Sequence, residues 1–299
     1  GFQGTRDAVA TANLAGTLEA YVEVHIEQGP VLQDLKQPAA AVAGISGQTR
    51  LSVAVRGTQG HAGTVPMTGR KDAVAAAAEM INYIEQRCTQ TKTKVESEHL
   101  PEDTMLVCTV GEVRVWPGAS NVISSNTNFT VDIRSKSDTE RDDTVKDVAA
   151  ALARMCAARG MECAVDRTHD ASAVLCDGAI TAGLKRATAE VYADIFAGAG
   201  GVASTAIYTG DGIRNGDGDG TAPAESVQPP VLISGAGHDA LAMAEACPIG
   251  MLFVRCRDGV SHSPLEHSEP EDVAFAARVL WRYLTIYQST GKRARDGEL

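Results

Sequence analysis

The chain has 299 residues, of which 44% are hydrophobic, and a formal net charge of −11. That length is enough for one large domain or two ordinary ones with a sizeable core. The acidic balance, with no basic run, argues against a nucleic-acid partner, and no apolar run approaches the ~20 residues that span a bilayer.

Seven cysteines are scattered through the chain, and their pattern argues against two common uses. Their number is odd and none forms a Cys-x-x-Cys pair, so we expect neither a disulfide framework nor a thiolate zinc site. Most are interpreted as small core residues. The seven are Cys88, Cys108, Cys156, Cys163, Cys176, Cys247 and Cys256.

The first patterned stretch, residues 21–30, follows a short helix predicted over 5–20. Apolar residues at 22, 24 and 26 alternate with Glu23, His25 and Glu27, and a Gly-Pro pair ends the run. The alternation predicts a half-buried strand whose polar face carries His25 between two carboxylates. From this pattern alone, His25 is either a satisfied structural histidine or a metal ligand or acid–base group.

Residues 49–170 form a second patterned region, after a short helix or turn at 31–36 and an apolar run at 39–45. The periodicity predicts, in order, strand 51–55, helix 70–87, strands 105–115 and 128–133, helix 138–159 and strand 162–167. The order β-α-β-β-α-β is that of the ferredoxin-like split βαβ plan. We therefore expect a self-contained domain at 49–170, inserted into a domain formed by 1–48 and 171–299.

The C-terminal part begins with a helix predicted over 177–196. Residues 197–228 have almost no large apolar side chains, which predicts a flexible surface insertion. Its Gly216–Gly220 run lacks the spacing of a calcium-binding EF-hand loop and is interpreted as solvated. Strand, glycine turn and helix follow at 231–246, then a buried strand at 249–255, a loop at 258–267 and a closing amphipathic helix at 269–285.

Four of the seven histidines, His25, His61, His238 and His262, lie in loops or near strand ends. Folds place functional side chains at such positions, because a rigid element aims a group that stays accessible. For any one of them a structural role is an equal alternative, but four in similar settings favour a shared function. His99 and His169 are interpreted as surface residues, and His267 as either a surface residue or a local hydrogen-bonding group.

The turn at Ser234–Ala240 follows a predicted strand and precedes a predicted helix. Its glycine spacing matches a dinucleotide fingerprint, but His238 stands where the helix should approach a pyrophosphate, so we discount that function. The free N–H groups of a helix start instead suit a carboxylate or a developing oxyanion. A serine hydrolase is also disfavoured, because no Gly-x-Ser-x-Gly motif occurs.

Seven ordered motifs together resemble the M20 metallopeptidase-like amidohydrolases. The branch concerned contains allantoate amidohydrolases, N-carbamoyl-L-amino-acid hydrolases and ureidoglycolate amidohydrolases, and the plant-type allantoate enzymes are the most similar. The resemblance covers nearly the whole chain except the insertion at 197–228. The motifs are His25–Pro30, Gly47–Arg50, Gly60–Met67, Ala119–Val122, Asp132–Arg134, Ser234–Asp239 and Gly259–Pro264.

The resemblance implies an α/β fold, with a zinc-peptidase-like catalytic domain that is partial here and an inserted ferredoxin-like lid that forms a homodimer. It also implies two divalent metal ions, Mn²⁺ or alternatively Zn²⁺, with His25 a ligand to one and His262 to the other. His61 would reach across the dimer to stabilise the oxyanion. The substrate would be held by Gln48, Asn121, Arg134, Ser234, Gly235, Gly237 and His238, with Asn121 and Arg134 on its carboxylate.

The family pattern also needs a His-x-Asp motif, a bridging Asp and a Glu-Glu pair that supplies the general base. This chain has no His-x-Asp and no Glu-Glu. We therefore expect it to be the C-terminal part of an enzyme, to bind metal poorly and to be inactive alone, because two histidines cannot hold two ions ~3.5–4 Å apart.

The expected reaction of the full-length enzyme is hydrolysis of allantoate to ureidoglycine, then ureidoglycolate, with ammonia and CO₂. The alternatives are an N-carbamoyl-L-amino-acid hydrolase, a ureidoglycolate amidohydrolase and, in another class, a non-catalytic M20-like dimerisation module. The resemblance to plant-type enzymes implies a location in the endoplasmic reticulum, although the location cannot be read from this chain itself.

Overall fold

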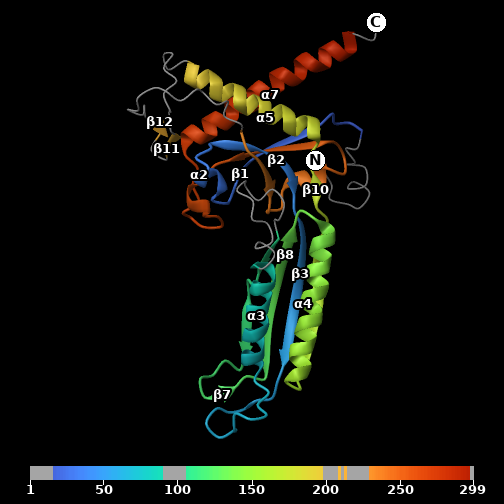
Figure 1. Ribbon diagram of the computed structural model, residues 1–299, viewed down its shortest axis with the longest axis vertical. Coiled ribbons are helices and arrows are strands. Elements are labelled where there is room, and N and C mark those ends of the chain that lie inside the picture. The colour runs from blue at the N-terminus through green and yellow to red at the C-terminus, as the bar shows by residue number, and fades with distance from the viewer. Residues whose placement is uncertain (1–15, 90–105, 198–207, 210–211, 214–228, 297–299) are drawn as a thin grey trace, which may run out of the picture. The chain divides into compact units, whose positions relative to one another are not determined.

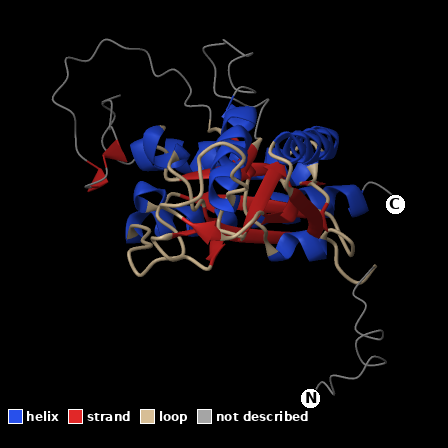
Figure 2. Cartoon of the chain, turned by 90° about the horizontal axis from the view of Figure 1, so that it is seen from below, coloured by secondary structure: helices blue, strands red, loops and turns tan. Residues whose placement is uncertain are grey.

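The computed structural model describes residues 16–89, 106–197, 208–209, 212–213 and 229–296, and the other residues are drawn in grey (Figure 1 and Figure 2). The chain divides into unit 1, Gly1–Ile45 with Leu175–Leu299, and unit 2, Ser46–Val174. The helix expected over 5–20 lies outside the described residues up to position 15, and 16–20 are turn and bend. Within the described residues, no helix is long and apolar enough to cross a membrane.

Unit 1 is built on a mixed sheet in the order β1-β14-β2-β10, with β13 also paired to β2. β1 runs parallel to β14, β14 runs antiparallel to β2, and β13 runs parallel to β2. β2 and β14 are continuous apolar runs, as expected for strands covered on both faces. The strands are β1 (Tyr21–Ile26), β2 (Ala39–Ile45), β10 (Val174–Leu175), β13 (Val231–Ser234) and β14 (Ile249–Val254).

Two long helices, α5 (Gly178–Ala197) and α7 (Pro270–Asp296), pack together over one face of this sheet (Figure 1). Their core includes Leu184 and Val279 with Leu252 of β14, all fully buried. α7 begins with Glu271 and Asp272 in its first turn, as the helix dipole prefers. The short elements are α2 (Val31–Asp34), α6 (Asp239–Met243) and η2 (Arg257–Gly259).

Two short strands, β11 (Tyr208–Thr209) and β12 (Gly212–Ile213), pair within the predicted insertion. The rest of 198–228, including the Gly216–Gly220 run, lies outside the described residues. The predictions of a flexible insertion and of a solvated loop therefore stay predictions.

Unit 2 has an antiparallel sheet in the order β5-β8-β3-β9, with β6 also paired to β8, and helices α3 and α4 covering one face. Odd-numbered residues of β3 are buried against the helices and even-numbered ones are not, which is the expected alternation of a half-covered strand. The order of elements along the chain is the predicted β-α-β-β-α-β. The elements are β3 (Gly47–Arg56), β4 (Gly60–His61), α3 (Ala73–Thr89), β5 (Val107–Thr109), β6 (Val113–Trp116), β7 (Val122–Ile123), β8 (Asn126–Ser135), α4 (Asp138–Ala158) and β9 (Glu162–Ala171).

The expectation that the cysteines form no disulfides is wrong for unit 2. Cys88 bonds to Cys108 and Cys156 bonds to Cys163, each pair with Cα atoms 6.1 Å apart. In both bridges the end of a helix is joined to a strand that packs beside it, so the fold rather than a local spacing motif brings the thiols together. The three cysteines of unit 1 are free and buried, as predicted, and burial raises the pKa of Cys176 to about 11.

Candidate metal centre

Three side chains of unit 1 converge: Glu23, His25 and His238 each offer a ligand atom, and these atoms lie within 4.8 Å of one another. Glu23 and His25 share one face of β1, because they are two residues apart on a strand. They pair in register with Met251 and Phe253 of β14. The alternate residues of β14 join the core beneath α5 and α7, so the cluster lies on the opposite face of the sheet.

His238 comes to this face from a distant part of the chain. It ends the turn between β13 and α6, and its extended backbone (φ −135°, ψ 162°) places it immediately before the first residue of α6. The turn contains Gly235 and Gly237, as predicted from the sequence. The His238 ring meets the His25 ring edge-on, with centroids 4.6 Å apart.

In each of the three side chains, one polar atom contacts a neighbouring group that fixes the position of the side chain. Oε2 of Glu23 accepts a hydrogen bond from the backbone N–H of Ala240 (2.9 Å). Nδ1 of His25 lies 2.7 Å from the carbonyl oxygen of Ile26, and Nε2 of His238 lies 2.6 Å from Oγ of Ser234. The remaining nitrogen of His238, Nδ1, is buried without a hydrogen-bond partner and lies 3.4 Å from Oε1 of Glu23.

The electrostatics favour a neutral His238 ring. Burial lowers the pKa of His238, and the neighbouring His25 lowers it further, against the opposing pull of Glu23. A neutral imidazole has a free lone pair, which is the form that binds metals.

Glu27, the second carboxylate of the opening strand, has a different role. Its two carboxylate oxygens accept hydrogen bonds from the N–H groups of Val31 (2.8 Å) and Leu32 (2.9 Å). It therefore caps the start of α2, satisfying donors that the helix leaves unpaired. Burial nevertheless raises the pKa of Glu27, because desolvation outweighs these two bonds.

Ser234, His238 and Glu23 are connected in the order of a serine-hydrolase triad, but the geometry does not support that chemistry. Ser234 is fully buried. Its Oγ also accepts from the N–H of Ala236 (3.1 Å) and donates to the carbonyl of Ala236 (3.3 Å). A nucleophile must reach its substrate, so Ser234 is a structural support of His238.

His262, the second predicted metal ligand, is not part of the three-residue group found among the described residues. It lies exposed in the loop after η2, in the left-handed region (φ 56°), and its backbone N–H bonds to Glu266 (3.0 Å). Non-glycine residues rarely adopt this conformation, and such strain gathers at functional loops. His262 therefore stays a predicted ligand, apart from the cluster.

In unit 2, Gln48 and Arg134 lie side by side on the uncovered face of the sheet, as register partners on β3 and β8. Both bond to Asp132: Arg134 through Nε (2.8 Å) and Nη2 (3.0 Å), and Gln48 through Nε2 (2.5 Å). Burial alone would raise the pKa of Asp132, but the bonds from Arg134, Gln48 and Arg50 outweigh it and hold the pKa below its usual range.

His61 and Asn121 lie together at the other end of unit 2. His61 pairs with Val122 in the β4–β7 ladder, and the backbone of Asn121 accepts from Ala62 N–H (2.9 Å). Both side chains are exposed. Eight residue steps of β3 separate Gln48 from this end, roughly 26 Å at the usual strand rise. One chain therefore does not bring Arg134 and Asn121 to the same small ligand.

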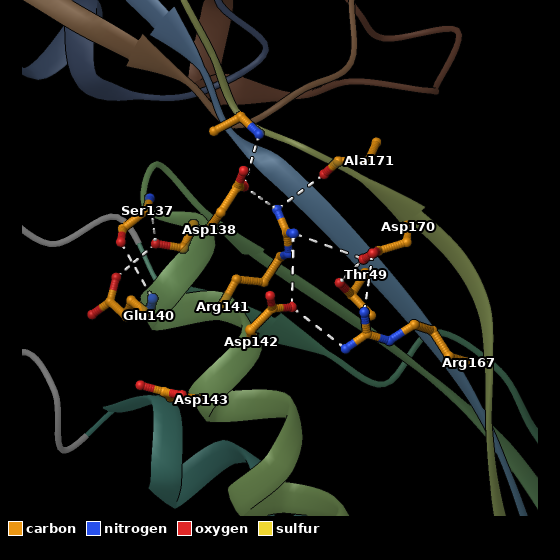
Figure 3. Close-up of polar contacts among 12 residues, drawn as sticks. Thr49, Ser137, Asp138, Glu140, Arg141, Asp142, Asp143, Arg167, Asp170 and Ala171 are labelled. Atoms are coloured by element: carbon orange, nitrogen blue, oxygen red, sulfur yellow. Dashed lines mark hydrogen bonds and ion pairs between the residues drawn. The ribbon is translucent and has the colours of Figure 1, made fainter.

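Arg141 of α4 is a buried charge that the sequence pattern did not single out (Figure 3). Its Nη1 donates to Asp138 (2.5 Å) and to the carbonyl of Ala171 (3.0 Å), and its Nη2 lies 3.8 Å from both Asp142 and Asp170. A Cβ added to Gly47 would lie 1.8 Å from Nη1 of Arg141. The guanidinium therefore packs directly on the backbone next to Gln48.

Comparison with known proteins matches residues 43–159 to the peptidase dimerisation domain of the M20 type. The chain is 42% identical to a probable allantoate deiminase of Oryza sativa subsp. japonica, over 94% of this chain and 54% of that protein. It is 34% identical to an N-carbamoyl-L-amino acid amidohydrolase of Geobacillus stearothermophilus, over 93% and 56%.

Among solved structures, it is similar to AtUAH in complex with glyoxylate (TM-score 0.71, 28% identity, 94% of this chain and 57% of that one). A hydantoinase/carbamoylase family amidase from Burkholderia multivorans is also similar (TM-score 0.70, 28% identity, 89% and 54%). The chain spans about half the length of the relatives it matches.

Proposed function

Since residues 43–159 belong to the M20 peptidase dimerisation family and the chain is related to amidohydrolases acting on C–N bonds, we propose that it forms part of an allantoate hydrolase. The reaction is allantoate and water to ureidoglycine, ammonia and CO₂. The observation that carries the proposal is the convergence of Glu23, His25 and His238 in a chain 42% identical to an allantoate deiminase.

The donor set fits a divalent metal ion. Two imidazoles and a carboxylate are ligands that Zn²⁺ and Mn²⁺ both accept. Nδ1 of His238 is buried and has no hydrogen-bond partner, so it is available as a metal ligand. When bound, such an ion polarises the ureido carbonyl and lowers the pKa of water. A second ion, with His262 among its ligands, belongs to the same proposal.

The residues of unit 2 bind and orient the substrate. Arg134 presents a planar guanidinium suited to a carboxylate, and Asp132 holds it by two hydrogen bonds. His61, exposed at the far end, donates to the oxygen on which negative charge develops. Because these groups lie roughly 26 Å apart within one sheet, a complete pocket needs His61 and Asn121 from a second copy of the chain.

A homodimer through unit 2 is therefore part of the proposal. The outer edge of β5 and β6 supports it, because each strand pairs only with β8 among the described residues. This edge also exposes apolar side chains: Val113 is 50% exposed and Trp116 is 66% exposed. Open apolar strand edges are ordinarily covered by a partner.

The compartment is proposed to be the endoplasmic reticulum. The support is the pair of disulfides in unit 2, Cys88–Cys108 and Cys156–Cys163, because such bonds form and persist in oxidising compartments.

The test is ammonia release from allantoate, ureidoglycolate and an N-carbamoyl-L-amino acid in the presence of Mn²⁺. We expect none from this chain alone, because it has no His-x-Asp and no Glu-Glu. Joined to the portion of the Oryza sativa relative that it does not cover, the chain should hydrolyse allantoate in preference to the other two substrates. A matching fusion with His25→Ala is the inactive control.

The outcomes separate the alternatives. Preference for the N-carbamoyl amino acid would assign the chain to that activity instead. A folded, dimeric fusion that hydrolyses none of the three substrates would support a non-catalytic dimerisation module. Manganese-dependent hydrolysis by the 299-residue chain alone would contradict the expected inactivity.

A further inference from the structure

We propose that the Cys88–Cys108 disulfide of unit 2 is a thiol–disulfide exchange site that controls the strand edge at which two copies of the chain associate. The closed bridge holds β5 on this edge, and its reduction by a dithiol releases β5 and dissociates the dimer. The bridge is thus a redox switch of self-association. This inference rests on the homodimer of the proposed function, but it does not depend on which substrate is hydrolysed.

β5 is attached to the sheet over a short length. It has three residues, Val107–Thr109, and pairs only with β8 among the described residues. The side chains of Val107 and Thr109 are exposed, so Cys108 is the one side chain of β5 that packs on the core beneath the helices. β3, by contrast, pairs with β8 along all ten of its residues. A short edge strand with one inward-facing side chain belongs to the least stable parts of a fold.

The bridge compensates for this weak attachment by joining β5 to a long helix. Cys88 lies in the last turn of α3, where it is 6% exposed and belongs to the same core cluster as Met80 and Ile84. A covalent bond from this buried position restrains the one inward-facing residue of β5. The restraint is large, because the bridge spans a sequence separation of 20 residues and therefore excludes many open conformations of the segment.

The second disulfide of unit 2, Cys156–Cys163, is not expected to control its strand in this way. It spans a sequence separation of only 7 residues and joins the last turn of α4 to the start of β9. β9 lies at the opposite edge of the sheet and pairs with β3 over nearly its whole length. The backbone hydrogen bonds of β9 therefore hold it in place without the bridge, and the two disulfides can be compared on one sheet.

Release of β5 affects both parts of the proposed pocket. Its residues pair in register with the β8 residues that are proposed to hold the substrate, because Val107 lies opposite Arg134 and Thr109 lies opposite Asp132. β5 is also one of the two strands of the edge proposed for the dimer, through which a second copy supplies His61. Reduction of the bridge is therefore expected to dismantle the pocket without changing any residue in it.

The exchange step needs a dithiol reductant and no other co-reactant. A thiolate of the reductant attacks Sγ of Cys108, which is partly exposed, and the S–S bond breaks to leave Cys88 as a thiolate. The second thiol of the reductant then attacks the mixed disulfide. The bridge gains two electrons and two protons to become two thiols, while the reductant becomes its own disulfide. In an oxidising compartment the bridge stays closed.

The experiment measures the dimer dissociation constant of the purified 299-residue chain by sedimentation velocity, before and after treatment with dithiothreitol. Mass spectrometry of alkylated thiols verifies which bridges are open. We expect the dissociation constant to rise by about 10-fold or more on reduction, because both protomers need an ordered edge and β5 in place in about a third of reduced molecules already gives this factor. Amide hydrogen exchange should become faster in β5 and stay slow in β3, which shows that unit 2 remains folded.

The matched control is the variant with Cys156→Ser and Cys163→Ser. It should dimerise when oxidised and dissociate on reduction, as the wild type does. The variant with Cys88→Ser and Cys108→Ser should associate weakly whether or not dithiothreitol is present. If that variant fails to fold, reduction of the control variant decides alone, because Cys88–Cys108 is then the disulfide of unit 2 that remains.

The inference is overturned if the reduced chain dimerises as tightly as the oxidised one, or if loss of the Cys156–Cys163 bridge weakens the dimer as much. It is also overturned if reduction accelerates exchange in β3 as much as in β5, because the bridge would then hold the whole of unit 2 together. A monomeric oxidised chain would overturn it together with the proposed homodimer. A redox-dependent dimer whose fusion hydrolyses none of the three substrates would refute the proposed hydrolase and leave the switch intact.

Discussion

The buried guanidinium of Arg141 provides a test of how unit 2 is held together. Arg141→Met keeps most of the side-chain volume and removes the charge. The change deletes charged hydrogen bonds to Asp138 and to the Ala171 carbonyl. It leaves Asp138 without its arginine partner, whereas Asp142 and Asp170 keep their ion pairs with Arg167. Breaking one side of a buried ion pair typically costs 3–5 kcal/mol. Asp138 and Asp142 are each 41% exposed and Asp170 is 44% exposed, so water compensates in part and we expect about 3 kcal/mol.

Hydrogen exchange followed by mass spectrometry measures this effect in each unit separately. A loss of about 3 kcal/mol corresponds to roughly 100-fold faster exchange of the most protected amides of β3 and β9. Amides of β14, in unit 1, should be unchanged. Arg154→Met is the control, because Arg154 is an exposed arginine on the same helix. The reasoning fails if Arg141→Met accelerates exchange in β3 and β9 no more than Arg154→Met does.

Three further predictions concern unit 2. The hydrogen bond from Thr49 is the largest cause that lowers the pKa of Asp170. A carboxyl whose pKa is lowered in the folded protein stabilises the fold at pH values above its unfolded pKa of ~3.9, and this stabilisation is lost as the pH falls through the folded-state pKa. Thr49→Val should therefore be less stable than the wild type at pH 7 in urea unfolding, with the gap closing on acidification; a constant gap would contradict this cause. Replacing Cys88 and Cys108 by alanine should lower the free energy of unfolding of unit 2 by about 3 kcal/mol, since the bridge closes a separation of 20 residues; non-reducing peptide mapping that finds both thiols free in the wild type would refute the bridge. Val113→Lys should turn the proposed dimer into a monomer by placing charge on the exposed edge, measured by analytical ultracentrifugation, whereas an unchanged dimer would exclude this edge.

The secondary structure of both units could largely be predicted from the sequence. Period-2 alternation identifies β1, and helical spacing identifies α3 and α4, because each element has one covered face. The ends of the elements were harder to predict. The sequence predicts the closing helix over 269–285, whereas α7 extends to Asp296. Helix continuation depends on local propensity, whereas the apolar periodicity only reports the packed part.

The site residues divide according to how their partners are brought together. His25 was accessible as a candidate because its own strand displays it. The role of Glu23 could not be predicted in this way. Its partner His238 lies 215 residues further along the chain and reaches Glu23 only through the turn from β13 to α6. The sequence separation carries no signal of that convergence, and the resemblance directed attention to His262 instead.

The buried and covalent features of unit 2 were missed for a related reason. An arginine on an amphipathic helix ordinarily faces water, and only the approach of Gly47 and β9 encloses Arg141. The two disulfides join helix ends to neighbouring strands at spacings that match no motif. The glycine at position 47 was a usable signal, since a residue without a side chain next to a predicted substrate-binding residue indicates close packing.

Anomalous diffraction from crystals of the chain loaded with Zn²⁺ tests the central claim most directly, because it locates the ion without reference to activity. We predict a strong peak within bonding distance of Glu23, His25 and His238, about 2.0–2.2 Å from each donor atom. A peak at His262 with none at the Glu23–His25–His238 cluster would contradict the account.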